Sequence, residues 1–112
     1  MTKEIINYED FNKLEIKVGT IIEAAAVPDS QKLVKLLVDF KTEKRQILTG
    51  MLKWYTPESF VGKQTLFLVN LAPRKMAGLE SQGMMLSIGT NHEDTPILIK
   101  PEIQAKDGDL IG

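Results

Sequence analysis

LFLVNLAPRKMAGLESQGMMLSI, residues 66–88, has two strand-like ends and a middle part that contains proline and glycine. Its first four residues are all apolar, which is typical of a strand covered by neighbours on both faces. Residues 84–89 alternate between two faces, as a second strand does. A proline and two glycines between residues 70 and 83 interrupt any regular element. The sequence therefore predicts two strands that carry a long loop, an arrangement typical of a binding site.

The loop carries cationic and polar side chains that suit the binding of RNA. Arg74 and Lys75 stand at its start, where arginine can fork onto phosphate or stack on a base and lysine adds a mobile charge. Ser81 and Gln82 at its end offer a hydroxyl and an amide, which can read ribose hydroxyls and base edges. The alternative is structural: a solvated cation pair, and a serine that ties off the backbone of the loop.

The order of the predicted elements is that of an oligonucleotide-binding barrel of five strands. One helical region comes first, then three strands, a short helix that opens with Pro57, and the two strands around the loop. We therefore predict an all-β fold, a five-stranded OB-fold barrel with short N-terminal and inter-strand helices and a C-terminal strand extension. The predicted helices cover residues 7–14 and 56–61, and the predicted strands cover residues 15–26, 33–40, 45–49, 66–69, 84–88 and, in the extension, 97–99.

The first two predicted strands show which side chains share a face. In the first strand, Ile16, Val18 and Ile22 share one face and Ile21 lies on the other. Gly19 in the middle of this strand predicts a bend or bulge, where a long strand turns a corner of the barrel. In the second strand, the side chains predicted to face the core are Val34, Leu36, Val38 and Phe40.

Two groups of aromatic residues are more typical of packing than of binding. Tyr8, Phe11 and Leu14 recur every three residues, which places them in one helical stripe that we predict to serve packing. Trp54 and Tyr55 precede the short helix, where an exposed ring could stack on an unpaired base. Aromatic residues at such a position usually pin the helix, so we predict that at least one of them packs.

Basic residues of the second and third strands predict a cationic stripe. Lys32, Lys35 and Arg45 would cross the face on which this fold binds its ligands, and Lys53 beside Trp54 is included with them. Charged side chains on exposed strand faces are common, so ordinary solvated residues are the alternative. The predicted interface comprises the loop of residues 26–32, the strands within residues 35–49 and the loop of residues 71–83.

Composition limits the classes of function. The chain has 14 basic and 15 acidic residues and a formal charge of −1, which favours a protein or small-molecule partner and requires a local patch if nucleic acid binds. It has no cysteine, so disulfides, cysteine zinc sites and thiol catalysis are excluded. With His92 as its one histidine and no phosphate-binding glycine motif, we expect no catalytic residue, no cofactor and no metal. No apolar run is long enough to span a membrane and no signal peptide is present, so we expect a cytoplasmic protein.

The pattern N-L-x-P-R-K-M-x-G-x-x-S-x-G-M in residues 70–84 resembles the signature of the tRNA-binding domain attached to methionyl-tRNA synthetases, which also occurs as free-standing dimers. The resemblance covers nearly the whole chain. It implies tRNA binding without catalysis and RNA contact by Ser81 and Met84, although a methionine at this position could also fill the core. The chain departs from the family at Gln31, where aspartate is frequent, and at Thr49, where serine is frequent. Neither change removes a cation.

We expect one domain over residues 1–112, in which residues 90–112 form a dimerisation extension, because the resembled family uses such added strands to form a homodimer. Capping of its own barrel is the alternative. The expected partners are tRNA, a second copy of the chain and the catalytic subunit of methionyl-tRNA synthetase, with no membrane. A related branch resembles secretion chaperones of the CsaA type, which bind peptides in an apolar groove, and a scaffold whose apolar tail docks on a larger enzyme is a third reading. The chain is compatible with a complete protein and with a piece of a longer synthetase.

Overall fold

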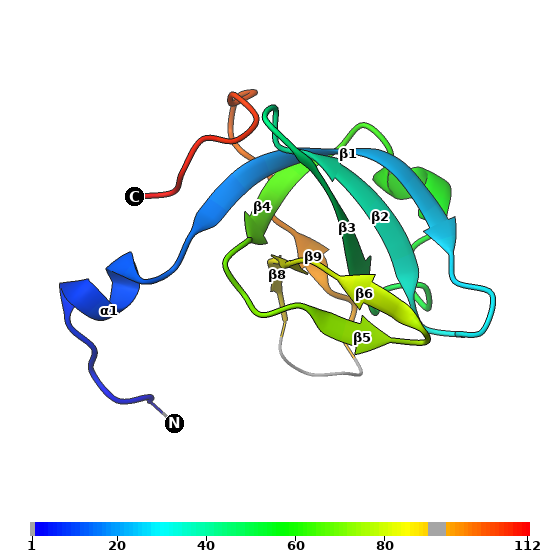
Figure 1. Cartoon of the computed structure of the whole chain (residues 1–112), viewed down its shortest axis with the longest axis horizontal. Helices are drawn as coiled ribbons and strands as arrows, with labels where there is room; N and C mark the ends of the chain where they lie inside the picture. The colour runs from blue at the N-terminus through cyan, green and yellow to red at the C-terminus, as the bar shows by residue number, and fades with distance from the viewer. Residues whose placement is uncertain (1, 90–93) are drawn as a thin grey trace.

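The computed structural model describes residues 2–89 and 94–112 and is nearly all-β (Figure 1). In chain order the elements are α1 (Tyr8–Asn12), β1 (Ile16–Ala26), β2 (Val34–Asp39), β3 (Lys44–Thr49), η1 (Pro57–Phe60), β4 (Gln64–Leu68), β5 (Arg74–Met76), β6 (Leu79–Ser81), β7 (Met84–Met85), β8 (Ser87–Ile88) and β9 (Ile97–Leu98). The predicted order of helices and strands is confirmed with two differences: β5 and β6 are added within residues 70–83, and the predicted strand of residues 84–88 is divided into β7 in the barrel sheet and β8, which pairs with β9. The other boundaries shift by one or two residues, and η1 is a 3-10 helix.

Five antiparallel strands in the order β3-β2-β1-β4-β7 curl into a nearly closed oligonucleotide-binding barrel (Figure 1). The long strand β1 belongs to both halves, because its first part pairs with β4 and its second part with β2. The predicted bulge lies between Ile21 and Glu23, where the register shifts. Gly19 serves close packing instead, because a Cβ there would lie 2.6 Å from Val38 Cγ1 and 2.7 Å from Phe40 Cε1.

The barrel interior is filled by the alternating residues of β2, as predicted. Val34, Leu36 and Val38 are fully buried, and Phe40 packs edge-on against Phe67 with 5.5 Å between the ring centroids. Ile21 is the residue of β1 that joins this core. The other members of the core cluster come from β3 and the segment after it, from η1, from the residue after β4 and from β7; they are Ile47, Met51, Phe60, Val69 and Met85.

The prediction of an irregular loop over residues 70–83 is wrong. β5 and β6 pair antiparallel within this segment and form a hairpin. The two residues between them, Ala77 and Gly78, have φ angles of 51° and 80°. Positive φ at both turn positions is the type I′ geometry that matches the twist of paired strands. Gly78 therefore builds a regular element, and the hairpin presents its side chains on two defined faces.

The helix α1 begins with the predicted cap. The Asn7 side chain accepts from the Asp10 N–H, and the Asp10 side chain accepts from the Asn7 N–H, which makes a capping box. The prediction that Tyr8, Phe11 and Leu14 pack is wrong for Tyr8 and Leu14, which are 73% and 47% exposed, whereas Phe11 is half-buried. Figure 1 shows the reason: α1 projects from the barrel on the segment that leads into β1.

The short helix η1 is pinned by an aromatic contact. Pro57 opens it, as predicted. The Tyr55 ring packs edge-on against Phe60 with 5.7 Å between centroids, and its hydroxyl donates to the carbonyl of Pro96 at 2.5 Å. The prediction that at least one of Trp54 and Tyr55 packs is therefore confirmed by Tyr55.

The C-terminal extension lies on its own barrel. β9 pairs with β8, and residues 108–111 run along the edge of β1 that β4 and β2 leave open. There the Val18 N–H donates to the carbonyl of Asp109 at 3.0 Å, and the Ile111 N–H donates to the carbonyl of Ile16 at 2.9 Å. The extension therefore caps the barrel, which is the alternative that the sequence allows beside a role in a dimer.

Candidate nucleic-acid interface

The hairpin separates the two cations that the sequence places side by side. Arg74 pairs with Ser81 across the hairpin, and Lys75 pairs with Glu80. Successive side chains of a strand point to opposite faces, so the two cations lie on different faces of the hairpin. Lys75 has a carboxylate directly across from it, whereas Arg74 faces a neutral hydroxyl. Both cations are exposed, and Arg74 has the less compensated charge.

Ser81 and Gln82 close the barrel against β3. Ser81 is 3% exposed, and its Oγ accepts from the Leu48 N–H at 3.0 Å and donates to the carbonyl of Gly83 at 3.0 Å. The Gln82 N–H donates to the carbonyl of Gln46 at 2.8 Å, and the Gln46 N–H donates to Gln82 Oε1 at 3.1 Å. Side-chain oxygens therefore take the place of carbonyls in a regular ladder. Both side chains serve the frame of the surface, which is the structural alternative raised by the sequence for Ser81.

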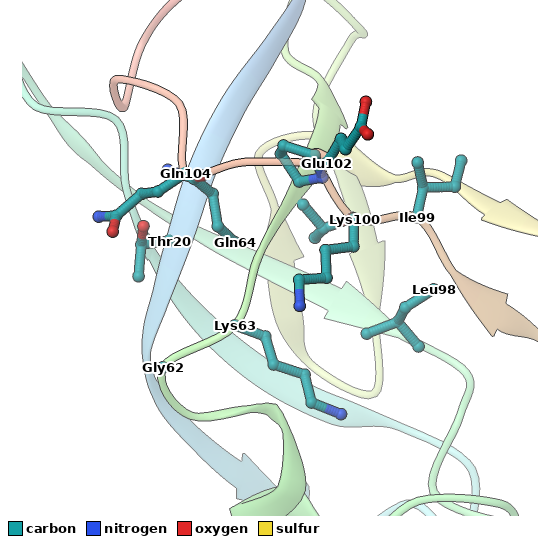
Figure 2. A pocket seen from close by; sticks show the side chains of 11 residues that line it. Thr20, Gly62, Lys63, Gln64, Leu98, Ile99, Lys100, Glu102 and Gln104 are labelled. Atoms are coloured by element: carbon teal, nitrogen blue, oxygen red, sulfur yellow. The ribbon is translucent and has the colours of Figure 1, made fainter.

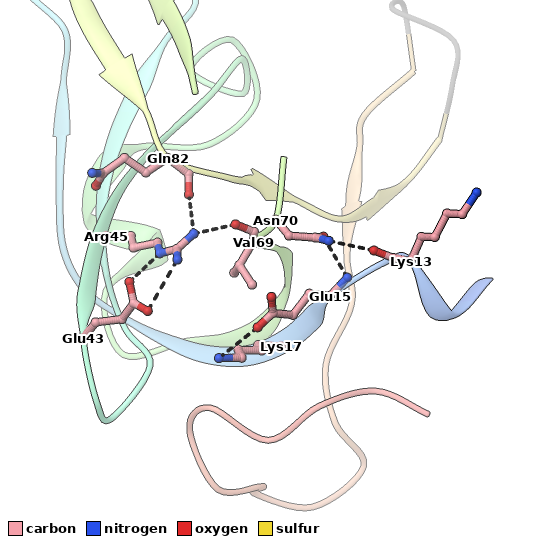
Figure 3. Close-up of polar contacts among 8 residues, drawn as sticks. All are labelled: Lys13, Glu15, Lys17, Glu43, Arg45, Val69, Asn70 and Gln82. Carbon is pink, nitrogen blue, oxygen red and sulfur yellow. Dashed lines mark hydrogen bonds and ion pairs between the residues drawn. The ribbon is translucent and has the colours of Figure 1, made fainter. Parts of the chain in front are cut away.

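Arg45 is clamped by groups of its own chain (Figure 3). Its Nε donates to Glu43 Oε1 at 2.6 Å, and its Nη1 donates to the carbonyls of Val69 at 2.5 Å and Gln82 at 3.2 Å. The hydrogen bond from Arg45 holds the pKa of the Glu43 carboxyl below its usual range. The Arg45 side chain is 26% exposed. Most of its donors are therefore used to join β3 to the ends of β4 and β6, and few remain for a phosphate.

Lys35 stands on the outer face of β2, in a groove of about 550 Å³ that is also lined by Val61. Its register partner Leu48 donates a hydrogen bond to Ser81, and Ser81 pairs with Arg74. One row of residues therefore crosses β2, β3, β6 and β5. With about 4.8 Å between neighbouring strands, this row spans roughly 15 Å from Lys35 to Arg74. The two middle members, Leu48 and Ser81, are buried, so the row joins the strands that carry the two exposed cations but does not itself form an exposed surface between them.

The other predicted contacts lie on the loops beside this row and on β7. Lys32 and Lys53 are exposed, and their loops are neighbours because the carbonyl of Lys32 accepts from the Leu52 N–H at 3.0 Å. The Lys53 ammonium lies 5.3 Å from the centroid of the Trp54 ring, within cation–π distance. Met84 is 43% exposed, so it lies outside the core.

Asn70 is not among the predicted site residues, and it ties the base of the hairpin to the segment before β1 (Figure 3). Its Nδ2 donates to the carbonyl of Lys13 at 2.6 Å, and its Oδ1 accepts from the Glu15 N–H at 2.8 Å. The signal for this role is an amide side chain at the end of a buried strand, shortly before Pro73. Glu43, the partner of Arg45, was also missed, because nothing in a strand pattern marks an ion pair between residues two apart.

Within the part of the chain that the structure describes, no group of three or more histidine, cysteine, aspartate or glutamate residues is arranged to hold a metal ion. His92, for which the sequence predicts no metal, lies outside the described residues. Across residues 2–89 and 94–112, no helix has the length and apolar character needed to cross a membrane.

The family model described as "Putative tRNA binding domain" matches residues 16–110 of the chain. The chain belongs to this tRNA-binding domain family. The domain is 44% identical over 110 residues, 97% of its length, to a methionine–tRNA ligase of Methanococcoides burtonii. It is also 44% identical over 106 residues, 95% of its length, to a methionine–tRNA ligase of Parabacteroides distasonis. The chain spans 16% of the length of each of these ligases, so the match is to one region of them.

Solved structures share the fold of this tRNA-binding domain. A MetRS-related protein from Pyrococcus horikoshii superimposes with a TM-score of 0.91 at 35% identity, over 98% of this chain and 100% of the other. The chaperone CsaA of Bacillus anthracis superimposes with a TM-score of 0.86 at 28% identity, over 97% and 100% of the two chains. The resemblance carried by residues 70–84 is confirmed, and the fold is common to both branches that the sequence suggests.

Proposed function

We propose that this tRNA-binding domain binds tRNA in the cytoplasm, as an appended domain or a separate subunit of a methionyl-tRNA synthetase. The observation that supports this most is the exposed Arg74 on the β5–β6 hairpin, which faces the neutral Ser81 and no carboxylate, in a chain of the tRNA-binding domain family. In this role the domain supplies RNA affinity and no chemistry, and needs no cofactor or metal. It raises the local concentration of tRNA beside the catalytic domain.

The residues of the proposed interface fall into two groups. The first group is exposed and can touch RNA directly, with cations for phosphate and an apolar methionine for ribose or base; its members are Lys32, Lys35, Lys53, Arg74, Lys75 and Met84. The second group makes internal hydrogen bonds that hold the surface in shape, and its members are Arg45, Ser81 and Gln82. Residues of the second group therefore act as positioning residues.

Charge reversal on the two faces of the hairpin tests this proposal. Arg74→Glu should weaken the binding of total tRNA by at least about tenfold, because attraction to phosphate becomes repulsion. Lys75→Glu on the other face should have a smaller effect. The control is Lys106→Glu, the same charge change on an exposed residue of the C-terminal segment, which should leave the affinity unchanged. Filter binding measures all three variants, and full affinity in a folded Arg74→Glu variant would remove the hairpin from the interface.

The salt dependence of binding separates phosphate contacts from frame residues. About 3–5 phosphate contacts, each contributing a slope near −0.7, predict a total slope of roughly −2 to −4 in log affinity against log salt. Lys35→Ala should flatten this slope by a little under one unit. Arg45→Ala should lower stability and leave the slope of the folded protein unchanged. Affinity that does not respond to salt between about 50 and 300 mM would exclude the electrostatic mechanism.

A second candidate function is peptide binding like that of a CsaA-type chaperone. The observation that favours it is the match to the chaperone CsaA of Bacillus anthracis along the full length of that protein. Peptide binding in an apolar groove should vary little with salt and show a negative heat-capacity change. Parallel titrations with total tRNA and with an unfolded peptide at matched salt distinguish the two functions.

We also propose that the domain forms a homodimer through residues beyond Gly89 together with α1. Leu110 and Ile103 in the extension are largely exposed, and the segment around α1 adds Ile5, which is 99% exposed, and Tyr8. Isolated helices as short as α1 are unstable in water, so packing against a second copy would explain its order. Exposed apolar side chains that gather into one patch mark interaction sites, so these residues are the candidates for burial against a second copy.

Point substitutions test the dimer more cleanly than truncation. A chain that stops at Gly89 also loses the hydrogen bonds of residues 105–111 to β1 and β4, so it would destabilise the barrel itself. Tyr8→Glu combined with Leu110→Glu changes two exposed side chains and should leave the barrel folded while the dimer dissociates. Analytical ultracentrifugation reads the outcome. An unmodified chain that already sediments as a monomer contradicts the dimer.

A further inference from the structure

A second concave site lies at the end of β4 that is remote from the hairpin (Figure 2). Its volume is about 680 Å³, inside the range of roughly 300–1,000 Å³ that is usual for ligand pockets. Residues 62–65 of the barrel form one side, and residues 98–102 of the C-terminal extension form the other. None of these residues belongs to the RNA interface proposed above, whereas residues 98–102 lie within the segment proposed to form the homodimer.

Two cations stand at the opening of this pocket. Figure 2 shows the side chains of Lys63 and Lys100 extending along the opening, whereas the carboxylate of Glu102 points away from both ammonium groups. Neither lysine makes an ion pair with a residue of the described chain. The Lys63 ammonium lies 6.0 Å from the centroid of the Tyr55 ring, which restrains its position. The opening therefore attracts an anion.

The lining also has an apolar wall, formed by Leu98, Ile99 and Pro101. The Thr65 hydroxyl does not serve a ligand here, because Thr65 is 1% exposed and shares a face of β4 with the core residue Phe67. The pocket thus suits a ligand with a charged end and a partly apolar body.

Hydrogen bonds to β1 and β4 hold the extension that forms one wall of the pocket. Gln64 Nε2 donates to the carbonyl of Ala105 at 2.8 Å and to Asp107 Oδ1 at 2.9 Å, and Thr20 Oγ1 donates to the same carboxylate oxygen at 2.7 Å. These bonds hold the extension in place, so binding does not have to order it. Residues 108–111 already occupy the nearby edge of β1, which an extended peptide would need for strand pairing.

We propose that this pocket binds a phosphate-bearing nucleotide unit, with its phosphate between Lys63 and Lys100 and its ribose against the wall around Leu98. The unit is either part of an RNA strand or a free mononucleotide. With an RNA strand, the inference rests on the proposed tRNA binding and extends its footprint along β4, a distance of about 17 Å for a strand of this length.

Titration with adenosine monophosphate tests the pocket independently of tRNA. We expect saturable binding at millimolar concentration, seen as shifts of the backbone amide NMR signals of Gly62, Lys63 and Lys100. Adenosine, which lacks the phosphate, should bind at least about tenfold more weakly, because two nearby ammonium groups favour the dianion. The Lys63→Glu/Lys100→Glu variant should lose this binding, and Lys106→Glu, on the same extension but outside the pocket, should keep it. The neutral Lys63→Gln/Lys100→Gln variant replaces the charge-reversal variant if that one does not fold.

Total tRNA separates the two sources of the nucleotide. A loss of tRNA affinity in the pocket variant but not in Lys106→Glu assigns the pocket to an RNA strand. Binding of adenosine monophosphate with unchanged tRNA affinity assigns it to a free nucleotide. The proposal is overturned if neither ligand responds to the pocket variants, or if tetraglutamate displaces adenosine monophosphate and binds more tightly. Failure of the proposed function has a different signature, because it appears as full tRNA affinity in Arg74→Glu.

Discussion

Replacing Ser81 with alanine removes the hydroxyl that joins β6 to β3, at a site only 3% exposed. In the structure this hydroxyl accepts from the Leu48 N–H at 3.0 Å and donates to the carbonyl of Gly83 at 3.0 Å. Alanine leaves the Leu48 N–H without this acceptor, and an unsatisfied buried donor costs about 1–3 kcal/mol. The Gly83 carbonyl also loses its hydrogen bond, but a carbonyl oxygen has two lone pairs, so its contribution to the loss of stability is smaller. We therefore expect the free energy of unfolding to fall by about 2 kcal/mol.

The corresponding change in melting temperature follows from chain length. An unfolding entropy of about 2.1 cal/mol/K per residue gives about 0.24 kcal/mol/K for 112 residues, so Ser81→Ala should lower Tm by about 8 °C. The control is Ser59→Ala, since the exposed Ser59 hydroxyl donates to the carbonyl of Thr56 at 2.7 Å and its loss should cost within about 0.5 kcal/mol.

Calorimetry and urea unfolding measure stability, and filter binding below the melting range measures affinity for total tRNA. A positioning role predicts that Ser81→Ala, while folded, retains most of its tRNA affinity. Unchanged stability together with a large loss of tRNA affinity would refute this reasoning and would make Ser81 a direct contact.

Three further predictions concern stability. Arg45 lowers the pKa of Glu43, so the ionised carboxylate stabilises the fold above its ordinary pKa of 4.5 and this stabilisation is lost as the pH falls towards the lowered value. Glu43→Gln should therefore reduce the loss of unfolding free energy at acid pH by under about 1 kcal/mol, as measured by urea unfolding at a series of pH values. Thr65→Val should raise the free energy of unfolding by about 1 kcal/mol in urea titrations, because it removes an unpaired buried hydroxyl; a decrease would mean that the hydroxyl has a partner. Gly19→Ala should lower the free energy of unfolding by about 1–3 kcal/mol, because the added Cβ clashes with side chains inside the barrel. The control Gly50→Ala should be nearly neutral, because nothing lies within 4 Å of its Cβ. Equal Tm values for the two variants would contradict the close packing at Gly19.

The elements that could be predicted are those whose side chains repeat with a simple period. Val34, Leu36 and Val38 alternate in sequence and are buried as predicted, because neighbouring residues of a strand point to opposite faces. The segment of residues 70–83 could not be predicted in this way. Gly78 is compatible both with an irregular loop and with a tight type I′ turn, and only pairing between the flanking residues selects the turn.

The stripe on α1 failed for a different reason. Its spacing correctly places Tyr8 and Leu14 on one side of a helix, but spacing does not say whether another element lies opposite. In the described chain none covers them, and both remain exposed.

The fold class, the family and the position of the cationic segment could be predicted from the sequence, because they depend on residue type, period and spacing along the chain. Which cations are available to a ligand depends instead on how the barrel closes. Lys35 and Arg45 lie on neighbouring strands and looked equivalent, but Arg45 donates to the carbonyls of Val69 and Gln82, which are 24 and 37 residues away along the chain. Hydrogen-bond partners so distant in sequence meet only when the barrel closes, so no local pattern can reveal them.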